Sequence, residues 1–240
     1  MKPIHARAGG YPVMLSFDDG PRPGSTERIL DVLAGRGLQP DRPLRAAFFT
    51  LAHNPPGWLA RRLLFAPYEI WTEKGSLVRH PDLARRIIEE GHWLGNHGAT
   101  HFWPRWPWYR NPRRVEAQLL EWERVADAVV PAWRGRSARL ARAPYLSRTS
   151  AWRAATARTG FTELGGMTTG DADPRAACDD VRRTLLTRLE RERRLAEQTS
   201  RPVLLIFHDI RELTAECLDG WLDAISAAGY ALTDFDPDRL

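Results

Sequence analysis

Short apolar runs alternate with stretches of helical spacing along most of the chain, and this alternation constrains the fold more than any other feature. Each apolar run has the length of a buried strand and is followed by turn residues. The runs interpreted as strands are residues 11–17, 46–51, 93–94, 139–141, 162–164, 203–207 and 230–232. The stretches interpreted as helices are residues 25–33, 82–90, 115–129, 179–198 and 218–227. The alternation predicts an α/β fold, close to a barrel of about seven parallel strands.

The length of 240 residues is typical of one parallel barrel, so we expect a single domain over residues 1–240. Hydrophobic residues make up 43% of the chain and charged residues 27%, which is enough apolar material for a core and excludes a disordered chain. Residues 52–76 are rich in proline and aromatic residues and form too long a stretch for an ordinary connection. We expect an insertion there that packs on the barrel, with a short helix at residues 59–64.

Charge and apolar content exclude several classes of protein. The net charge is +5, but the basic residues are spread among acidic ones, so we expect no nucleic-acid partner. No apolar run approaches the roughly 18 residues that span a bilayer. Residues 1–10 lack the apolar core of about 7–15 residues that a secretion signal needs, so we expect a cytoplasmic protein. Two cysteines, Cys178 and Cys217, make neither a disulfide-rich scaffold nor a cysteine-built zinc module.

Polar residues follow four of the predicted strands, and in a parallel barrel the reactive groups lie at the C-terminal ends of the strands. These residues are Asp18-Asp19, His97 to His101, Arg142 to Tyr145, and His208-Asp209. The adjacent carboxylates of Asp18 and Asp19 repel each other, and a divalent metal would relieve that repulsion. The alternative is an ordinary turn, because Asp-Gly-Pro is common turn chemistry.

His97 and His101 are four residues apart, a spacing that on a helical turn places both imidazoles on one face, where they can share a metal ion. Gly98 stands where a zinc protease needs glutamate, so that protease signature is excluded. Two histidines and one aspartate leave metal positions open for water and substrate, as a catalytic site requires. The alternative is a pair of surface histidines in an aromatic loop.

His208 follows a buried apolar run, and because an imidazole titrates near neutrality it is a candidate general acid or base. Its alternative role is that of a hydrogen-bonded capping residue. Arg142 is a candidate for orienting a neighbouring carboxylate, or else one surface arginine among many. In the aromatic stretch 101–110, the rings of Trp103 and Trp106 either stack on a sugar or pack the insertion onto the barrel.

Taken in order, four of these segments resemble the motifs of the polysaccharide deacetylases, carbohydrate esterase family 4. The segments are Ser16-Phe17-Asp18-Asp19-Gly20-Pro21, His97-x-x-x-His101, Arg142-x-Pro144-Tyr145, and the apolar run into His208-Asp209. The similarity extends from about residue 12 to residue 235. It implies a distorted (β/α) barrel that uses a divalent metal to remove N-acetyl groups from an N-acetylated sugar or polysaccharide.

Carried over residue by residue, the resemblance implies a metal site and a base. Asp19, His97 and His101 would hold the divalent metal, with zinc expected and cobalt, manganese or nickel as alternatives. Asp18 would take the proton of the attacking water as general base. Arg142 would hold Asp18 in place.

The resemblance also implies which residues act on the other side of the acetyl group. His208 would protonate the leaving amine as general acid. The backbone N–H of Tyr145 would help to bind the oxyanion, where the loss of one donor typically costs roughly 10²–10³ in rate. Pro144 would contact the substrate, as would Trp103 and Trp106 if their rings stack on sugar.

This chain departs from the family pattern at three places. Gly98 replaces the usual serine or threonine after the first metal histidine, and Leu146 replaces the usual glycine after Pro-Tyr. The fourth motif, Asp-x-x-Asp-Trp, keeps only its first residue at Asp173, with Ala176 and Ala177 in place of the other two. The carboxylates that remain as candidates to tune the general acid are Asp171, Asp173 and Asp179.

Two other functions fit the same residues. The altered fourth motif and the expected insertion leave room for hydrolysis of a non-sugar linear amide on this fold. The third hypothesis is a catalytically inactive homologue that only binds carbohydrate. The presence of an acid, a base and three metal ligands together argues against it, because binding alone does not require them.

Overall fold

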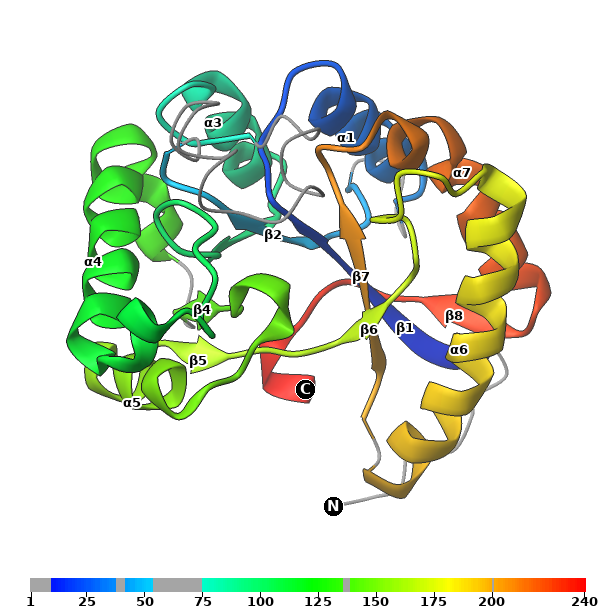
Figure 1. Ribbon diagram of the computed structural model, residues 1–240. Coiled ribbons are helices and arrows are strands. Elements are labelled where there is room, and N and C mark those ends of the chain that lie inside the picture. The colour runs from blue at the N-terminus through cyan, green and yellow to red at the C-terminus, as the bar shows by residue number, and fades with distance from the viewer. Residues whose placement is uncertain (1–9, 38–41, 54–74, 136–138, 200) are drawn as a thin grey trace.

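The computed structural model describes residues 10–37, 42–53, 75–135, 139–199 and 201–240, and its centre is a parallel β-sheet that curls into a distorted barrel (Figure 1). The strands are β1 (Tyr11–Asp18), β2 (Ala47–Thr50), β3 (Trp93–Asn96), β4 (Leu140–Ala141), β5 (Thr162–Glu163), β6 (Met167–Thr168), β7 (Val203–His208) and β8 (Tyr230–Leu232). Seven strands follow the order β5-β4-β3-β2-β1-β7-β6, and β8 pairs with the start of β1. Among the described residues no ladder joins β5 to β6, so the barrel is open between them.

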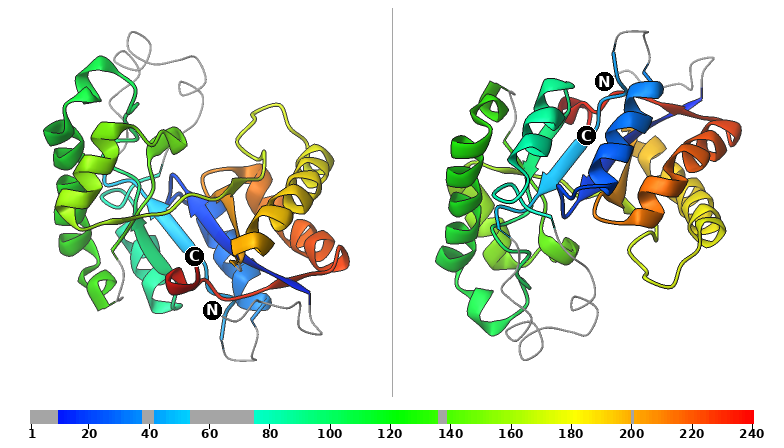
Figure 2. Two further views of the ribbon diagram at one scale, coloured as in Figure 1. Left: turned by 90° about the horizontal axis from the view of Figure 1, so that it is seen from below. Right: turned by 90° about the horizontal axis from the view of Figure 1, so that it is seen from above.

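Helices cover the outer face of this sheet. They are α1 (Ser25–Gly35), α3 (Pro81–Glu89), α4 (Pro112–Val129), α5 (Ser150–Thr159), α6 (Cys178–Thr199) and α7 (Glu212–Ala227), with 3-10 turns η2 (Pro107–Arg110), η3 (Pro131–Gly135), η4 (Pro144–Leu146) and η5 (Pro237–Arg239). Figure 2 shows α4 and α5 on one side of the central strands and α6 and α7 on the other. None of the described helices is long and apolar enough to cross a membrane.

The alternation of side chains along β1 separates the core from the polar interior. Successive side chains of a strand point to opposite faces of the sheet. Val13, Leu15 and Phe17 belong to the large cluster beneath the helices, whereas Met14 belongs to a smaller cluster inside the barrel. Asp18 shares the face of Met14, so its carboxylate enters the barrel interior where the strand ends.

The interior of the barrel is apolar at one end and polar at the other. The buried residues of the inner cluster are Met14, Ala47, Phe49, Leu140, Leu204 and Phe235, with Trp93, Leu164 and Leu240 packed against them. Phe235 and Leu240 come from the C-terminal segment, which therefore contributes to the apolar end (Figure 1). On β7 the alternation places Leu204 inside and brings His208 to the polar end, where it is the register partner of Asp18.

The fold class expected from the sequence, a distorted α/β barrel, is confirmed. The expected strands and helices are present with ends shifted by three residues or fewer, except that α7 begins at Glu212 rather than at residue 218. The insertion expected over residues 52–76, with its helix at 59–64, lies almost wholly outside the described residues.

Two elements, α5 and β6, were not expected, and each lacks the pattern that reveals its class. α5 buries Ala151, Trp152, Ala155, Thr156 and Thr159, and a stripe of alanine and threonine around one tryptophan gives little apolar periodicity. Its start is marked by the Thr149 side chain, which accepts the backbone N–H of Trp152 as an N-cap. β6 is two residues long, which is too short to show an alternation.

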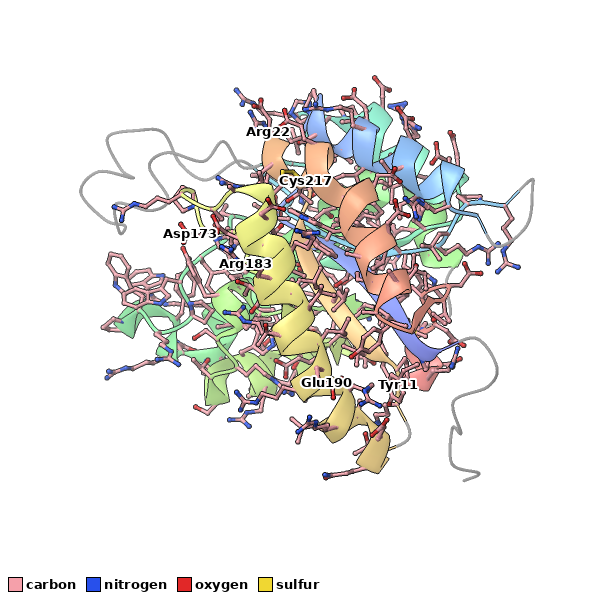
Figure 3. The ribbon with its side chains drawn as sticks, turned by 90° about the vertical axis from the view of Figure 1, so that its right-hand side faces the viewer. Tyr11, Arg22, Asp173, Arg183, Glu190 and Cys217 are labelled. Atoms are coloured by element: carbon pink, nitrogen blue, oxygen red, sulfur yellow. A yellow bond between two sulfur atoms is a disulfide. The ribbon has the colours of Figure 1, made fainter. Side chains whose placement is uncertain are left out.

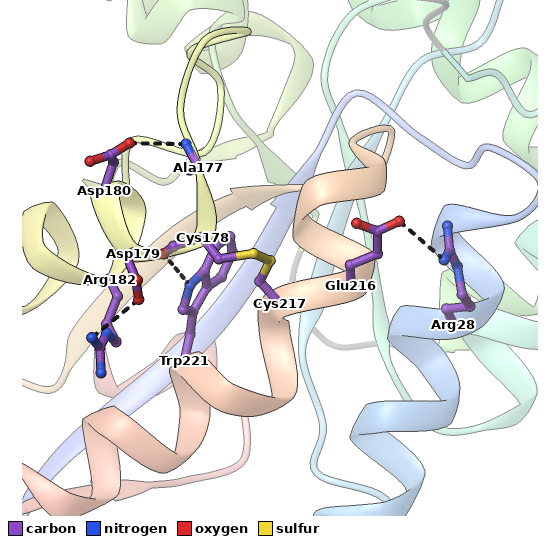
Figure 4. The surroundings of a disulfide bond; sticks show 9 residues. All are labelled: Arg28, Ala177, Cys178, Asp179, Asp180, Arg182, Glu216, Cys217 and Trp221. Atoms are coloured by element: carbon purple, nitrogen blue, oxygen red, sulfur yellow. Dashed lines mark hydrogen bonds and ion pairs between the residues drawn. A yellow bond between two sulfur atoms is a disulfide. The ribbon is translucent and has the colours of Figure 1, made fainter.

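A disulfide joins the start of α6 to α7 (Figure 4). The Cα atoms of Cys178 and Cys217 are 5.8 Å apart. The indole N–H of Trp221, one turn further along α7, donates a 2.9 Å hydrogen bond to the Cys178 carbonyl. These two links fix where α6 begins, and they therefore also anchor the end of the loop that connects β6 to α6.

Candidate metal centre and catalytic pocket

The polar end of the barrel opens into a cavity of about 390 Å³. Six of the residues expected to act in catalysis or metal binding line it: Asp18, Asp19, His97, His101, Tyr145 and His208. The other lining residues are Leu146, Thr168, Gly170, Asp171, Ala172, Asp173, Arg188 and Ile206. A second hollow, of about 490 Å³, lies against the start of β7 and contains none of the predicted site residues. The cavity of interest for chemistry is therefore the one at the C-terminal ends of the strands.

Arg142 is completely buried and holds Asp18 from behind the cavity. Its Nη1 donates a 2.6 Å hydrogen bond to Asp18 Oδ1 and a 3.0 Å hydrogen bond to Ser16 Oγ. Its Nε and Nη2 donate to the carbonyls of Leu164 and Gly165, in the segment between β5 and β6. A charge-assisted hydrogen bond inside the barrel fixes the orientation of the Asp18 carboxylate.

Asp19, His97 and His101 converge on one point although they come from two separate loops. Oδ1 of Asp19 lies 3.1 Å from Nε2 of His101 and 3.5 Å from Nε2 of His97. All three residues are buried, and one ligand atom from each lies within 4.8 Å of the others. Asp19 leaves β1 with a φ of 82°, a left-handed conformation uncommon outside glycine, and its carboxylate lies in the same cavity as that of Asp18.

The His97 ring is oriented and neutral, as a metal ligand must be. Its Nδ1 lies 2.9 Å from the carbonyl oxygen of Arg142, and because a carbonyl only accepts, Nδ1 carries the proton. The lone pair is therefore on Nε2, on the side of Asp19. Burial, acting against the nearby Asp18 charge, lowers the pKa of His97 to about 4. This donor set of two imidazoles and one carboxylate, with a fixed outer partner, fits a divalent metal.

The expectation that His97 and His101 share a face of a helical turn is wrong, because the segment between them is a loop. Gly98 has a φ of +87° and His101 a φ of 46°. A Cβ at Gly98 would also lie 3.1 Å from the Phe102 ring. In this chain glycine at position 98 is therefore explained by backbone conformation and by the buried aromatic side chain beside it.

Asp171 contacts His208 at two points. It is therefore the one of the three candidate carboxylates, Asp171, Asp173 and Asp179, that is placed to tune the general acid. Its Oδ1 lies 3.0 Å from His208 Nδ1, and its Oδ2 accepts the His208 backbone N–H at 2.7 Å. Thr169 and Thr214 donate to the two remaining positions at 3.0 and 2.8 Å. The fourth-motif aspartate expected at Asp173 is thus displaced by two residues, because β6 ends at Thr168 and was not foreseen.

The ionisation of His208 follows from that contact. Burial lowers the pKa of His208, but the charge and the hydrogen bond of Asp171, together with the charges of Asp19 and Asp18, outweigh burial and raise the pKa to about 9. The same pairing lowers the pKa of Asp171 despite its burial. Of the other candidates, Asp179 pairs with Arg182 on the surface of α6, and Asp173 accepts the backbone N–H of Arg175.

Tyr145 and Leu146 form a wall of the cavity in a left-handed turn. Their φ values are 57° and 51°. Leu146 thus adopts the conformation for which glycine is favoured, at a cost of order 1 kcal/mol or more. The Tyr145 ring lies 4.6 Å from that of His101, which places the turn beside the candidate metal ligands.

Three residues predicted to contact substrate, Pro144, Trp103 and Trp106, are not among those lining the cavity. Pro144 is buried behind the turn. Trp103 has 45% of its surface exposed, and its carbonyl accepts the backbone N–H of Trp106. Their substrate contacts stay predictions. Sequence reasoning in turn missed two polar lining residues, Thr168 and Arg188, because neither follows an expected strand.

Comparison with known proteins gives a family for this arrangement. The polysaccharide deacetylase family model matches residues 6–164. A curated chitooligosaccharide deacetylase of Sinorhizobium fredii is 33% identical over 140 residues, which cover 57% of this chain and 48% of the relative. Across four curated chitooligosaccharide deacetylases of rhizobia, the matches span only 28% to 48% of the relative's length.

Solved structures show the same fold at low identity. The chitin deacetylase of Colletotrichum lindemuthianum has a TM-score of 0.67 at 20% identity, over 97% of this chain and 89% of that one. A family 4 acetyl xylan esterase from Clostridium thermocellum, solved in complex with a cobalt ion, has a TM-score of 0.63 at 18% identity, over 93% and 87%. With a family model that matches two thirds of its length, the chain belongs to the polysaccharide deacetylase family.

Proposed function

We propose that this chain is a metal-dependent hydrolase that removes N-acetyl groups from an N-acetylated sugar or polysaccharide. The observation that carries the proposal is one cavity shared by a three-ligand set at Asp19, His97 and His101, a carboxylate at Asp18 and an imidazole of raised pKa at His208. Membership of the polysaccharide deacetylase family supports the reaction, and curated relatives named for chitooligosaccharides support the class of substrate.

Asp19, His97 and His101 are the proposed metal ligands. A divalent metal bound there would act as a Lewis acid on the acetyl carbonyl and lower the pKa of a water ligand. Zinc is the metal we propose, because two imidazoles and one carboxylate with open positions match its catalytic sites. Cobalt, manganese and nickel accept the same kinds of donor atom.

Asp18 is the proposed general base. Arg142 engages its Oδ1, which leaves Oδ2 on the side of the ligand set, 3.9 Å from His97 Nε2. Because the paired oxygen fixes the rotamer, Oδ2 meets the attacking water in a single orientation and accepts its proton.

His208 is the proposed general acid. An amine leaves only after its nitrogen is protonated, so the acid must hold its proton at the working pH. With a pKa raised to about 9, His208 is protonated at neutral pH. Asp171 holds Nδ1, so Nε2 is the nitrogen that delivers the proton. Asp18 and His208 end adjacent strands, but Arg142 holds the base and Asp171 holds the acid, so the two groups have different partners in one site.

We assign the binding of the acetyl oxygen to the backbone N–H of Tyr145, which lies in a left-handed turn on the cavity wall beside His101. Pro144 shapes that turn from behind. Trp103 offers a half-exposed ring for stacking on a sugar, with Trp106 bonded to its backbone.

The test is an assay of two products from two classes of substrate. Wild-type protein loaded with zinc should release free amine from oligomers of N-acetylglucosamine, and Asp18→Asn should bind the metal but lose turnover. Release of acetate or amine only from small non-sugar amides would show that the enzyme acts on that class of substrate and not on N-acetylated sugars. No turnover on either class, with intact metal binding, would reduce the chain to a carbohydrate-binding homologue.

A further inference from the structure

One arginine that lines the cavity has no part in the proposed chemistry and forms no ion pair with the described residues. Arg188, on α6, lines the same cavity as Asp18 and His208. Within the part of the chain that the structure describes, no carboxylate lies within 4.0 Å of its guanidinium. Four other arginines of the same helix each pair with a carboxylate: Arg182, Arg183, Arg193 and Arg194.

The guanidinium of Arg188 is nevertheless anchored. Its Nη1 donates two hydrogen bonds of 2.9 Å, to the carbonyl oxygen and to the hydroxyl of Thr168 at the end of β6. A guanidinium has five N–H donors, and toward described residues this one donates from Nη1 alone. The edge formed by Nε and Nη2 is the geometry that binds a carboxylate or phosphate through two parallel hydrogen bonds.

Arg188 lies on the side of the cavity that carries the general acid. Thr168 is followed by Thr169, whose hydroxyl donates to Asp171, the partner of His208. The acid protonates the nitrogen that stays on the sugar, so the sugar ring occupies this side. A substituent on that ring, or on its neighbour in the chain, is therefore the part of the substrate nearest to Arg188.

Of the four carboxylates among the described residues of the cavity wall, two form ion pairs and one belongs to the ligand set. Asp18 is paired with Arg142 and Asp171 with His208, while Asp19 belongs to the ligand set. Asp173, at the exposed rim, accepts the backbone N–H of Arg175, and its carbonyl accepts a hydrogen bond from Arg211. Figure 3 shows Asp173 close to the start of α6, with Arg183 further along that helix.

We propose that Arg188 makes this pocket selective for N-acetylated sugars that carry an anionic group, a carboxylate or a phosphate. The proposal rests on the proposed function, because it assigns a specificity to that same site. Anchoring by Thr168 reduces the side-chain entropy lost when the anion binds. Because Arg188 is solvent-exposed, the preference for the anionic substrate is about two- to fivefold and falls as salt is added.

The experiment compares three forms of one oligosaccharide: tetra-N-acetylchitotetraose, the same chain with a 6-carboxylate, and the same chain with a 6-phosphate. The ratio of kcat/KM for the anionic forms over the neutral form is measured in wild type, Arg188→Gln, Arg188→Lys and Arg183→Ala. Arg183 is the matched control, an exposed arginine of α6 that pairs with Asp180 outside the cavity. We expect the ratio to fall to about one in Arg188→Gln, to persist in part in Arg188→Lys and to be unchanged in Arg183→Ala.

A binding measurement separates this proposal from the proposed function. The affinities of the three oligosaccharides for Asp18→Asn, with and without Arg188→Gln, are measured by calorimetry. An anionic preference in binding that depends on Arg188 supports the inference even if wild type shows no turnover. A ratio equal in wild type and Arg188→Gln, for both the carboxylate and the phosphate, overturns it even if deacetylation is observed. A response to only one of the two anions identifies which is recognised.

Discussion

Both carboxylate oxygens of Asp171 contact His208. Oδ1 lies 3.0 Å from the ring Nδ1, and Oδ2 accepts the backbone N–H at 2.7 Å. The bidentate contact fixes the ring against the end of β7 and sets its charge. Thr214, on α7, donates to the same carboxylate, and the disulfide through Cys217 lies one turn further along that helix. The acid side of the pocket is thus tied to one helix by two separate links.

Replacing Asp171 with asparagine removes the charge that keeps His208 protonated. In the metal-free protein the pKa of His208 should fall from about 9 toward its ordinary value near 6.5, because only the charges of Asp18 and Asp19 then oppose burial. The measurement is the pH titration of the His208 ring signals by NMR. Asp173→Asn, in the same loop but without contact to the ring, is the control and should leave the titration where it was. A His208 pKa unchanged in Asp171→Asn would remove Asp171 as its partner.

The same pair makes stability depend on pH. A histidine whose pKa is higher in the folded state stabilises the fold fully below about pH 6.5, and this contribution is lost as the pH rises through about 9. Wild type should therefore lose about 3 kcal/mol of unfolding free energy relative to Asp171→Asn between pH 6 and pH 10. Denaturant unfolding of both metal-free proteins at the two pH values measures this difference. An unfolding free energy that changes equally with pH in both proteins would contradict the assignment of Asp171 as the partner that raises the pKa of His208.

Arg142→Met should destabilise the fold far more than the loss of a surface arginine. It leaves the buried carboxylate of Asp18 without its cation, which typically costs about 3–5 kcal/mol. The matched control is Arg148→Met, which breaks a pair between an exposed arginine and Glu163 and should cost at most about 1 kcal/mol. Unfolding free energies at neutral pH compare the two. Equal losses of unfolding free energy in the two variants would show that the buried ion pair stabilises the fold no more than the exposed one.

Reduction of the Cys178–Cys217 disulfide should destabilise the protein by about 2–4 kcal/mol, because it releases a cross-link over 39 residues. Unfolding with and without a thiol reductant measures the loss, and Cys178→Ser with Cys217→Ser should reproduce it. Disulfides persist mainly in oxidising compartments, so the redox state of this pair bears on the expected cytoplasmic location. Mass spectrometry after alkylation of protein from its native cells tests whether the disulfide forms and where the protein is located. Two alkylated thiols would favour the cytoplasm.

Much of the site could be predicted because its residues stand directly after recognisable strands. β1 and β7 are continuous apolar runs, so Asp18 and His208 mark the end of each without any knowledge of the fold. Their Cα atoms prove to be register partners. What no spacing rule gives is the path of the loop after β3, where Gly98 and His101 adopt left-handed conformations rather than a helical turn.

The remaining errors have a common cause in short or alanine-rich elements. β6 has two residues and no recognisable pattern, so its end could not be predicted, nor could the choice of Asp171 over Asp173 as the partner of His208. Arg188 could not be assigned for the same reason, because its contact is with Thr168 on that strand. These positions depend on how a short segment crosses the open side of the barrel, which is decided by packing rather than by local pattern.

Metal content, measured by elemental analysis after loading with zinc and removal of excess, tests the central claim most directly. The convergence of Asp19, His97 and His101 within 4.8 Å predicts about one bound ion per chain in wild type and nearly none in His101→Ala. His53→Ala is the control, since His53 lies outside the ligand set and contacts Glu121 at 2.7 Å. It should retain the wild-type metal content. Full metal occupancy in His101→Ala would contradict the account.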